Sequence, residues 1–294
     1  MLKRHAALAS SLLLGLAACS GDSSTPTALR ADRALAQEAA SGGTVVVTES
    51  DISRQADDTP PLRNWVLYTI AAGNGAFVTG PATPPLGVGS ITLTTPTPAD
   101  KVQLYNFDHI GTKLADIRSM SYSTYRTIGA FEQVTAINVV IDFNGPKTDG
   151  GFSTLVFEPV YNNTTQGPVV SGRWQNWDAY KGGNGIWWST RAINGVCARE
   201  CYVTWETIVS NNPNATILGG FGLNQGRGGE ALVASADALH LDTKNMSITY
   251  DFEPLRLATS KEACKDDGWK TLKRADGSGF KNQGDCVSYT ENGK

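Results

Sequence analysis

Four tryptophans that lie close together are the residues of this sequence most suggestive of chemistry. Trp174, Trp177, Trp187 and Trp188 fall within fifteen residues. Aromatic faces stack on the C–H faces of sugar rings, and nearby acids and amides orient sugar hydroxyls. The region therefore predicts a sugar-binding surface made of Trp174, Gln175, Asn176, Trp177, Asp178, Trp187 and Trp188. The alternative is a core role, because an aromatic side chain buries about 150–250 Å².

Trp187 and Trp188 are adjacent in the chain, and this limits what they can do together. In a strand, neighbouring side chains point to opposite faces. At most one of the two then belongs to the core side, and the other lies outside, under a loop or in a groove.

Two acids are the candidates for catalysis. Glu158 and Asp178 could form the carboxylate pair of a glycoside hydrolase. Neither acid lies in a hydrolase signature, and exposed or turn-forming acids are the commoner explanation. A Ser-His-Asp triad has no support, because there is no G-x-S-x-G elbow and the histidines beyond the first residues, His109 and His240, stand alone. The sequence thus favours a non-catalytic protein, with no catalytic residue assigned.

A run of oxygen-bearing residues is the weak candidate for a metal site. Asp142, Asn144 and Asp149 surround a turn, but Pro146 stands where an EF-hand loop needs a side-chain ligand. A plain hairpin turn is the favoured explanation. No cofactor is expected, and a structural calcium at these residues is the alternative.

The N-terminus has the pattern of a bacterial export signal. Lys3 and Arg4 precede a short apolar run, which falls short of the ~20 residues that span a bilayer. Leu16-Ala17-Ala18-Cys19 resembles the lipobox of bacterial lipoproteins, which implies diacylation of Cys19 and removal of residues 1–18. The alternative is an ordinary signal peptide followed by a chance cysteine. Ser20 in place of aspartate favours the outer membrane where the organism has one.

The other four cysteines form an even set, which outside the cytoplasm usually pairs. Sequence order suggests Cys197–Cys201 and Cys264–Cys286, although four cysteines allow three connectivities. A zinc site is the weaker alternative, because no histidine lies near either pair.

Composition and periodicity predict an all-β protein. The chain has 31 glycines and 13 prolines, and its net charge of −3 becomes −5 without Lys3 and Arg4. No basic stripe is present, so nucleic acid is excluded as a partner. The body of the protein begins at Val45-Val46-Val47. Short alternating stretches predict strands of two packed antiparallel sheets at 90–94, 101–105, 119–126, 136–143, 154–158, 217–223 and 247–252. A helix is expected at Trp205–Ser210, with Thr204 as N-cap. The glycine-rich stretch from Gly219 to Gly229 is interpreted as a flexible connection between two strands, with a ligand-facing loop as the alternative.

These signals divide the chain into four segments. Residues 1–18 form the signal, 19–43 a lipidated flexible stalk, 44–257 a β-sandwich domain and 258–294 a small cysteine-bracketed tail. The tail has few apolar residues, so we expect a hairpin that depends on the Cys264–Cys286 bond.

Several motifs carry a family resemblance across most of residues 45–254. They include Gly80-Pro81-Ala82-Thr83-Pro84-Pro85-Leu86-Gly87-Val88-Gly89-Ser90, Trp174-Gln175-Asn176-Trp177-Asp178-Ala179 and Tyr250-Asp251-Phe252-Glu253. The chain resembles a group of uncharacterised exported bacterial β-sandwich proteins, which implies a jelly roll similar to lectin-like and carbohydrate-binding modules. The tail is similar to a short ending of many exported bacterial proteins. Neither resemblance implies an agreed activity.

Together these features predict a lipid-anchored, extracytoplasmic module that binds a glycan or cell-wall polymer without altering it. Its partners would be the membrane, through Cys19, and a polysaccharide. One alternative is a structural or adhesive surface protein that binds another protein. The other is a glycoside hydrolase with an unrecognised carboxylate pair.

Overall fold

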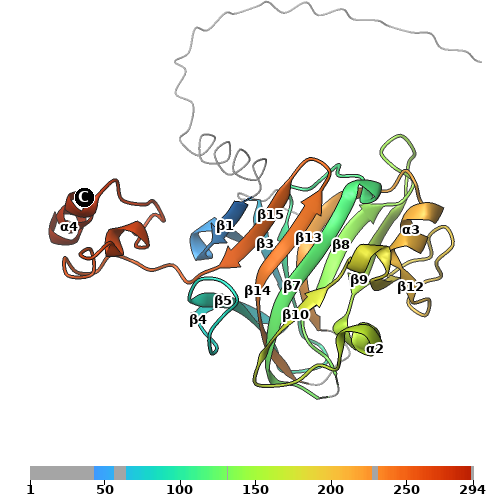
Figure 1. Ribbon diagram of the computed structural model, residues 1–294, viewed down its shortest axis with the longest axis horizontal. Coiled ribbons are helices and arrows are strands. Elements are labelled where there is room, and N and C mark those ends of the chain that lie inside the picture. The colour runs from blue at the N-terminus through green and yellow to red at the C-terminus, as the bar shows by residue number, and fades with distance from the viewer. Residues whose placement is uncertain (1–42, 56–63, 131, 227–230, 293–294) are drawn as a thin grey trace, which may run out of the picture.

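Two β-sheets pack face to face in the computed structural model of this protein (Figure 1). The structure describes residues 43–55, 64–130, 132–226 and 231–292. Nearly all strand pairs are antiparallel, and one parallel pair lies at an edge of each sheet. The predicted class, an antiparallel jelly-roll β-sandwich with a short helix, is confirmed. The signal, Cys19 and almost all of the stalk lie outside the described residues.

The seven-stranded sheet is organised around the long strand β14. Strand β14 pairs with β7 on one side and with β5 and β15 on the other. The members are β1 (Gly43–Val47), β4 (Asn74–Thr79), β5 (Gly89–Thr95), β7 (Ile117–Ile128), β10 (Trp174–Asp178), β14 (Leu232–Thr243) and β15 (Ser247–Phe252).

The eight-stranded sheet has the order β12-β11-β9-β8-β13-β6-β3-β2. Its central neighbours are far apart in the sequence, so non-local pairing brings them together. The members are β2 (Ile52–Gln55), β3 (Trp65–Ile70), β6 (Lys101–Asn106), β8 (Ala136–Asp142), β9 (Phe152–Phe157), β11 (Ile186–Ser189), β12 (Val203–Thr204) and β13 (Thr216–Gly226).

The core lies between the sheets and follows from strand alternation. Leu104 of β6, Val139 of β8 and Leu223 of β13 are fully buried there, opposite Leu93 and Leu241 of the other sheet. Intervening residues of the same strands point outward, as the period of two requires. All seven predicted strands are present. Strand β14 was not predicted, because a bulge at Asp237–His240, with Ala238 at φ 53°, breaks its alternation.

Short helical segments connect the strands. The predicted helix is α3 (Trp205–Asn211), and the Thr204 side chain accepts the N–H of Thr207 as its N-cap. The other segments before the tail are α2 (Asn163–Gln166) and the 3-10 turns η1 (Glu49–Asp51), η2 (Leu114–Asp116), η3 (Pro159–Asn162) and η4 (Lys181–Gly183).

The glycines from Gly219 to Gly226 form part of strand β13, so their interpretation as a flexible connection is wrong. They make room for neighbours instead. A Cβ on Gly220 would lie 2.4 Å from Cγ of Tyr105, and one on Gly222 would lie 2.1 Å from the Leu104 carbonyl oxygen. Residues 227–230 lie outside the described part.

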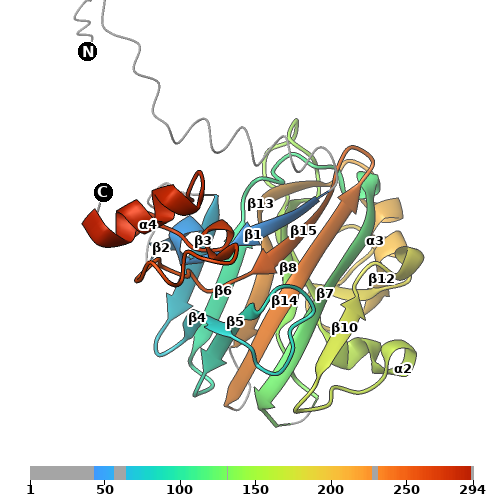
Figure 2. The ribbon, with the colours of Figure 1, turned by 60° about the vertical axis from the view of Figure 1, so that its left-hand side comes forward.

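The tail contains the predicted Cys264–Cys286 disulfide, but the predicted hairpin is wrong. Its elements are η5 (Gly268–Lys270) and α4 (Gln283–Asn292). Helix α4 begins there because Asn282 Oδ1 accepts the N–H of Asp285, as an N-cap does. The tail lies beside one edge of the sandwich (Figures 1 and 2). Its small buried cluster consists of Ala258, Cys264, Leu272, Phe280 and Cys286.

Candidate functional site

The four tryptophans do not form one surface. Trp177 of β10 and Trp187 of β11 are fully buried in the core, so neither can stack on a ligand. Their indole N–H groups donate inside the protein, to Thr124 Oγ1 and the Ala179 carbonyl. The tryptophans also belong to different sheets, since β10 pairs with β7 and β11 pairs with β9.

Trp174 supports the loop between β4 and β5. Its indole N–H donates to the Pro81 carbonyl at 2.8 Å, and its ring contacts Tyr125 with centroids 5.8 Å apart. This loop carries the Gly80–Ser90 motif. Two further contacts hold it, because the N–H of Leu86 donates to Asp237 and the N–H of Val88 donates to Glu253. The motif is thus explained by packing on the seven-stranded sheet.

The polar residues near Trp174 are engaged with the backbone. Gln175 accepts the N–H of Val170 and donates to the Pro168 carbonyl. Asn176 donates to the Tyr122 carbonyl, and Asp178 Oδ1 accepts the N–H groups of Tyr180 and Lys181. These contacts fix turns and strand edges, which explains the residues without a ligand.

The outer side of the eight-stranded sheet carries a different set of residues. The strand register aligns Trp188, Val156, Asn138, Gly222, Tyr105 and Val66 in one row across the sheet. The next row contains Ala136, Asn224, Gln103 and Tyr68, with Glu158 just beyond the end of β9. We call this the polar face and define it by Tyr68, Gln103, Tyr105, Asn138, Glu158, Trp188 and Asn224.

Tyr105 is the centre of the polar face. Its ring covers Gly220 of β13, and its hydroxyl accepts the amide N–H of Asn138 at 2.9 Å from the far side of that strand. The Gln103 amide donates to the same hydroxyl. Tyr68 adds a second ring, with centroids 6.1 Å apart. The glycines therefore allow one aromatic side chain to join three strands.

Buried oxygen atoms without a hydrogen-bond partner gather on this face. Within the described residues these include Asn138 Oδ1, Asn224 Oδ1 and Ser53 Oγ, and Ser53 lies beside Val66 at the end of the first row. A buried acceptor that lacks a donor costs about 1–3 kcal/mol. Native proteins rarely leave such groups unpaired, so these three atoms need donors that the described side chains do not supply, from bound water or from a ligand.

Glu158 and Trp188 border the face on the β9 and β11 side. The Trp188 indole N–H donates to Glu158 Oε2 at 2.8 Å. Burial raises the pKa of the Glu158 carboxyl, and the Trp188 hydrogen bond opposes that change. Both side chains are partly exposed to solvent.

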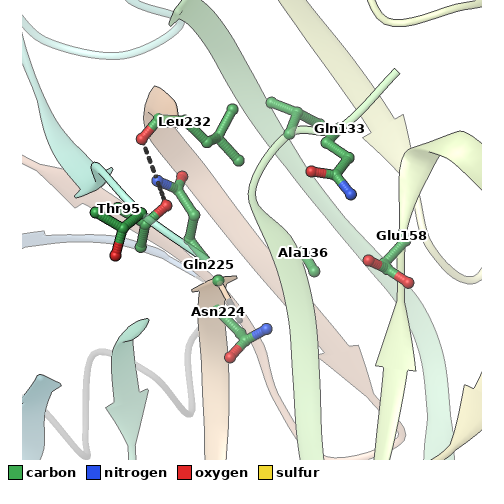
Figure 3. A pocket seen from close by; sticks show the side chains of 10 residues that line it. Thr95, Gln133, Ala136, Glu158, Asn224, Gln225 and Leu232 are labelled. Carbon is green, nitrogen blue, oxygen red and sulfur yellow. Dashed lines mark hydrogen bonds between the residues drawn. The ribbon is translucent and has the colours of Figure 1, made fainter. Parts of the chain in front are cut away.

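A pocket of about 50 Å³ lies next to Glu158 (Figure 3). Glu158, Ala136 and Asn224 come from adjacent strands there, and Gln133 lies on the side away from Asn224. The amide of Gln225 closes the inner end by donating to the carbonyls of Leu93 and Leu232. The full lining is Thr95, Thr97, Gln133, Val134, Ala136, Glu158, Asn224, Gln225, Gly226 and Leu232.

The remaining candidates have structural surroundings. Asp142 Oδ1 accepts the N–H groups of Asn144 and Gly145 in the hairpin between β8 and β9. Across the described residues, no three His, Cys, Asp or Glu side chains are placed to hold a metal. The predicted Cys197–Cys201 disulfide is present.

Sequence reasoning missed Tyr105, Asn138 and Asn224. Tyr105 and Asn138 occupy outward positions of predicted strands, so alternation alone marks them as facing away from the core. Asn224 directly follows the strand predicted at 217–223, in the stretch interpreted as a flexible connection. Their adjacency depends on the strand order, which no local pattern reveals.

Comparisons with known proteins give little beyond the fold. No protein-family model matches, and no curated protein matches. A family 11 carbohydrate-binding module from Clostridium thermocellum, solved with a mixed-linked tetrasaccharide, is 8% identical with a TM-score of 0.34. That match covers 64% of this chain and 93% of the module. The enzymatically active domain of bacteriophage CBA120 tailspike protein 4 is 8% identical with a TM-score of 0.29, over 58% of this chain and 18% of the tailspike chain. Likeness at this level says nothing about what this chain binds.

Proposed function

We propose that this protein binds a neutral, hydroxyl-rich glycan on the polar face and does not cleave it. The observation that carries the proposal is the set of buried, unpartnered oxygens at Asn138, Asn224 and Ser53. Sugar hydroxyls are donors of the kind that these acceptors lack. Tyr68 and Trp188, both partly exposed, supply aromatic surface beside them, in the combination of apolar wall and few polar groups that suits ligand sites.

The charge of the face selects the kind of sugar. Asn138 and Asn224 offer acceptors, and Glu158 adds a carboxyl group. An acidic sugar would bring a second negative charge next to Glu158 and gain no donor. Neutral sugars meet the need for donors without that repulsion.

Binding fits the geometry better than hydrolysis. Glycoside hydrolysis normally uses two carboxyl groups that flank the scissile bond. In the described lining of the pocket, Glu158 is the one carboxyl group. Asp178, its proposed partner, lies on β10 of the other sheet and accepts backbone N–H groups.

The location that we propose is the cell envelope, outside the cytoplasm. Two disulfides are typical of proteins from oxidising compartments. None of the helices in the described part has the length and apolar character to cross a membrane. The tether in this proposal is a diacylated Cys19, and mass spectrometry of the N-terminus in the native host tests it. An unmodified N-terminus at another residue would contradict the anchor.

The binding proposal is tested on a glycan array of neutral, amino and acidic oligosaccharides, together with peptidoglycan. The unmodified protein should bind neutral glycans, and Asn138→Leu should lose that binding, because it replaces the acceptor with an apolar side chain of similar size. Trp174→Phe, on the other sheet, is the control and should bind normally.

Three results would count against the proposal. If the protein binds no glycan on the array, a structural or adhesive role would be favoured. Normal binding by Asn138→Leu would place the site elsewhere. Release of reducing ends from a bound glycan would show hydrolysis.

A further inference from the structure

Two exposed tyrosines contact each other at the edge of the polar face. Tyr161 and Tyr202 are 42% and 44% exposed, and their ring centroids lie 4.2 Å apart with an interplanar angle of 37°. They come from different segments, Tyr161 from η3 and Tyr202 from the residue before β12. We call this pair the tyrosine platform.

Asn162 fixes the Tyr161 side of the platform. It is almost fully buried, and its amide donates to the carbonyls of Glu158 and Ile186, at 3.1 and 3.0 Å. Its Oδ1 accepts the N–H of Ile186 at 2.9 Å. Segment η3 is therefore joined to Glu158 itself and to β11, the strand that carries Trp188.

Tyr202 is held on both sides along the chain. The Cys197–Cys201 disulfide, with Cα atoms 5.3 Å apart, closes the loop directly before it. Directly after it, Val203 pairs with Trp187 in the ladder between β12 and β11.

The platform is continuous with the polar face. Val203 of β12 pairs with Trp187 of β11 in an antiparallel register. Tyr202, which precedes Val203, therefore lies on the same side of the pair as Trp188, which follows Trp187. Tyr161 follows Glu158 by three residues, and its N–H donates to the Glu158 carbonyl at 3.1 Å. The two rings thus extend the face past the hydrogen-bonded pair of Glu158 and Trp188.

We propose that the tyrosine platform is a second sugar subsite, which stacks on one ring of a glycan chain whose neighbouring units occupy the polar face. This inference rests on the proposed function. The polar face supplies hydrogen-bond acceptors, whereas the exposed rings supply an apolar surface for C–H faces. The Cys197–Cys201 disulfide holds Tyr202 in position, so recognition of longer chains depends on the oxidised loop.

The test compares long and short neutral sugars by titration calorimetry. The probes are cellohexaose with cellobiose, mannohexaose with mannobiose and xylohexaose with xylobiose. Tyr202→Ala and Tyr161→Ala should weaken hexasaccharide binding by about threefold to tenfold and leave disaccharide binding unchanged. The double variant C197S/C201S should weaken hexasaccharide binding in the same way. Phe152→Ala is the matched control, because Phe152 is also 42% exposed but lies at the far end of β9.

The outcomes separate the two proposals. If the unmodified protein binds none of the six sugars, the proposed function fails and the subsite falls with it. If it binds them and both tyrosine variants keep the same ratio of hexasaccharide to disaccharide affinity, the platform is structural and the subsite alone is overturned. A loss in Phe152→Ala equal to that in Tyr202→Ala would also overturn it.

Discussion

The indole N–H of Trp188 donates to Glu158 Oε2 at 2.8 Å. Consecutive strand positions send Trp187 into the core and Trp188 to the outer face, where it meets an acid from the neighbouring strand. The contact holds a half-buried carboxyl group beside the pocket, at the border between the polar face and the tyrosine platform.

Trp188→Phe should weaken binding of neutral glycans by roughly tenfold, about 1.4 kcal/mol, because the Glu158 carboxyl group loses the hydrogen bond that holds it beside the pocket. The pKa of Glu158 should rise further in this variant, since the opposing hydrogen bond is lost. Calorimetry and urea unfolding measure affinity and stability on the same samples. Trp174→Phe also loses an indole hydrogen bond, but on the other sheet, so it should lose stability alone. Equal affinities of the two variants would contradict this assignment.

Asn224→Ala should lower glycan affinity without lowering the free energy of unfolding. Its Oδ1 is buried without a partner, so removing it relieves a cost of about 1–3 kcal/mol. Asn212 is the matched control, because its Oδ1 is also unpartnered while its amide donates to the carbonyls of Asn194 and Ile208. Asn212→Ala should unfold more easily and still bind. A large stability loss in Asn224→Ala would show that Asn224 is a structural residue.

His109 should make the fold acid-sensitive. Burial lowers its pKa from 6.5 to about 4. The unfolded chain therefore binds a proton more readily than the folded protein does. The contribution of neutral His109 to the free energy of unfolding is complete above pH 6.5 and is lost as the pH falls toward 4, a total change of about 3 kcal/mol. His109→Gln can keep a hydrogen bond to the Tyr250 hydroxyl, which lies 2.9 Å from His109 Nε2. Urea unfolding at pH 7 and 4.5 should show a smaller decline in the variant, and parallel declines would exclude His109 as the cause.

The contribution of Asp251 to stability should have the opposite dependence on pH. Burial, with the charges of Asp237 and Glu253 nearby, raises its pKa from 3.8 to about 7. The fold therefore favours the protonated form, and this contribution is lost as the pH rises through 7. Asp251→Asn stays neutral, so its advantage in melting temperature over the unmodified protein should grow from pH 5 to pH 8. A constant difference across that range would contradict the raised pKa.

Loss of the Cys264–Cys286 bond should loosen the tail and spare the sandwich. Closing a loop of this length contributes roughly 3 kcal/mol in the chain-entropy model. The tail cluster holds few buried residues, whereas the sandwich has its own large core. In C264S/C286S, amide exchange should accelerate across α4 and stay unchanged in β13. Faster exchange in β13 would show that the two parts unfold together.

Local patterns predicted the part of the fold that depends on neighbouring residues. The strand at 136–143 and the Thr204 cap follow from alternation and capping chemistry. Strand β14 was missed because its bulge hides the period, and α4 was missed because its cap, Asn282, precedes a polar segment with little amphipathic pattern.

The candidate site was only partly accessible from sequence, because strand order decides it. The four tryptophans lie close together in the sequence, which predicted a shared surface. However, β10 and β11 belong to different sheets, and two of the four side chains lie in the core. Gln103, Asn138 and Asn224 are far apart in the chain and meet only because β6, β13 and β8 are neighbours. Their alternation could mark them as outward-facing, but their proximity required the tertiary pairing.

Amide hydrogen exchange with and without cellohexaose, mannohexaose and xylohexaose tests the central claim most directly. We expect a bound hexasaccharide to slow exchange near Tyr105, Asn138 and Trp188, and to leave the Gly80–Ser90 loop on the other sheet unchanged. Protection confined to that loop and Trp174, or no protection anywhere at saturating sugar, would contradict a glycan site on the polar face.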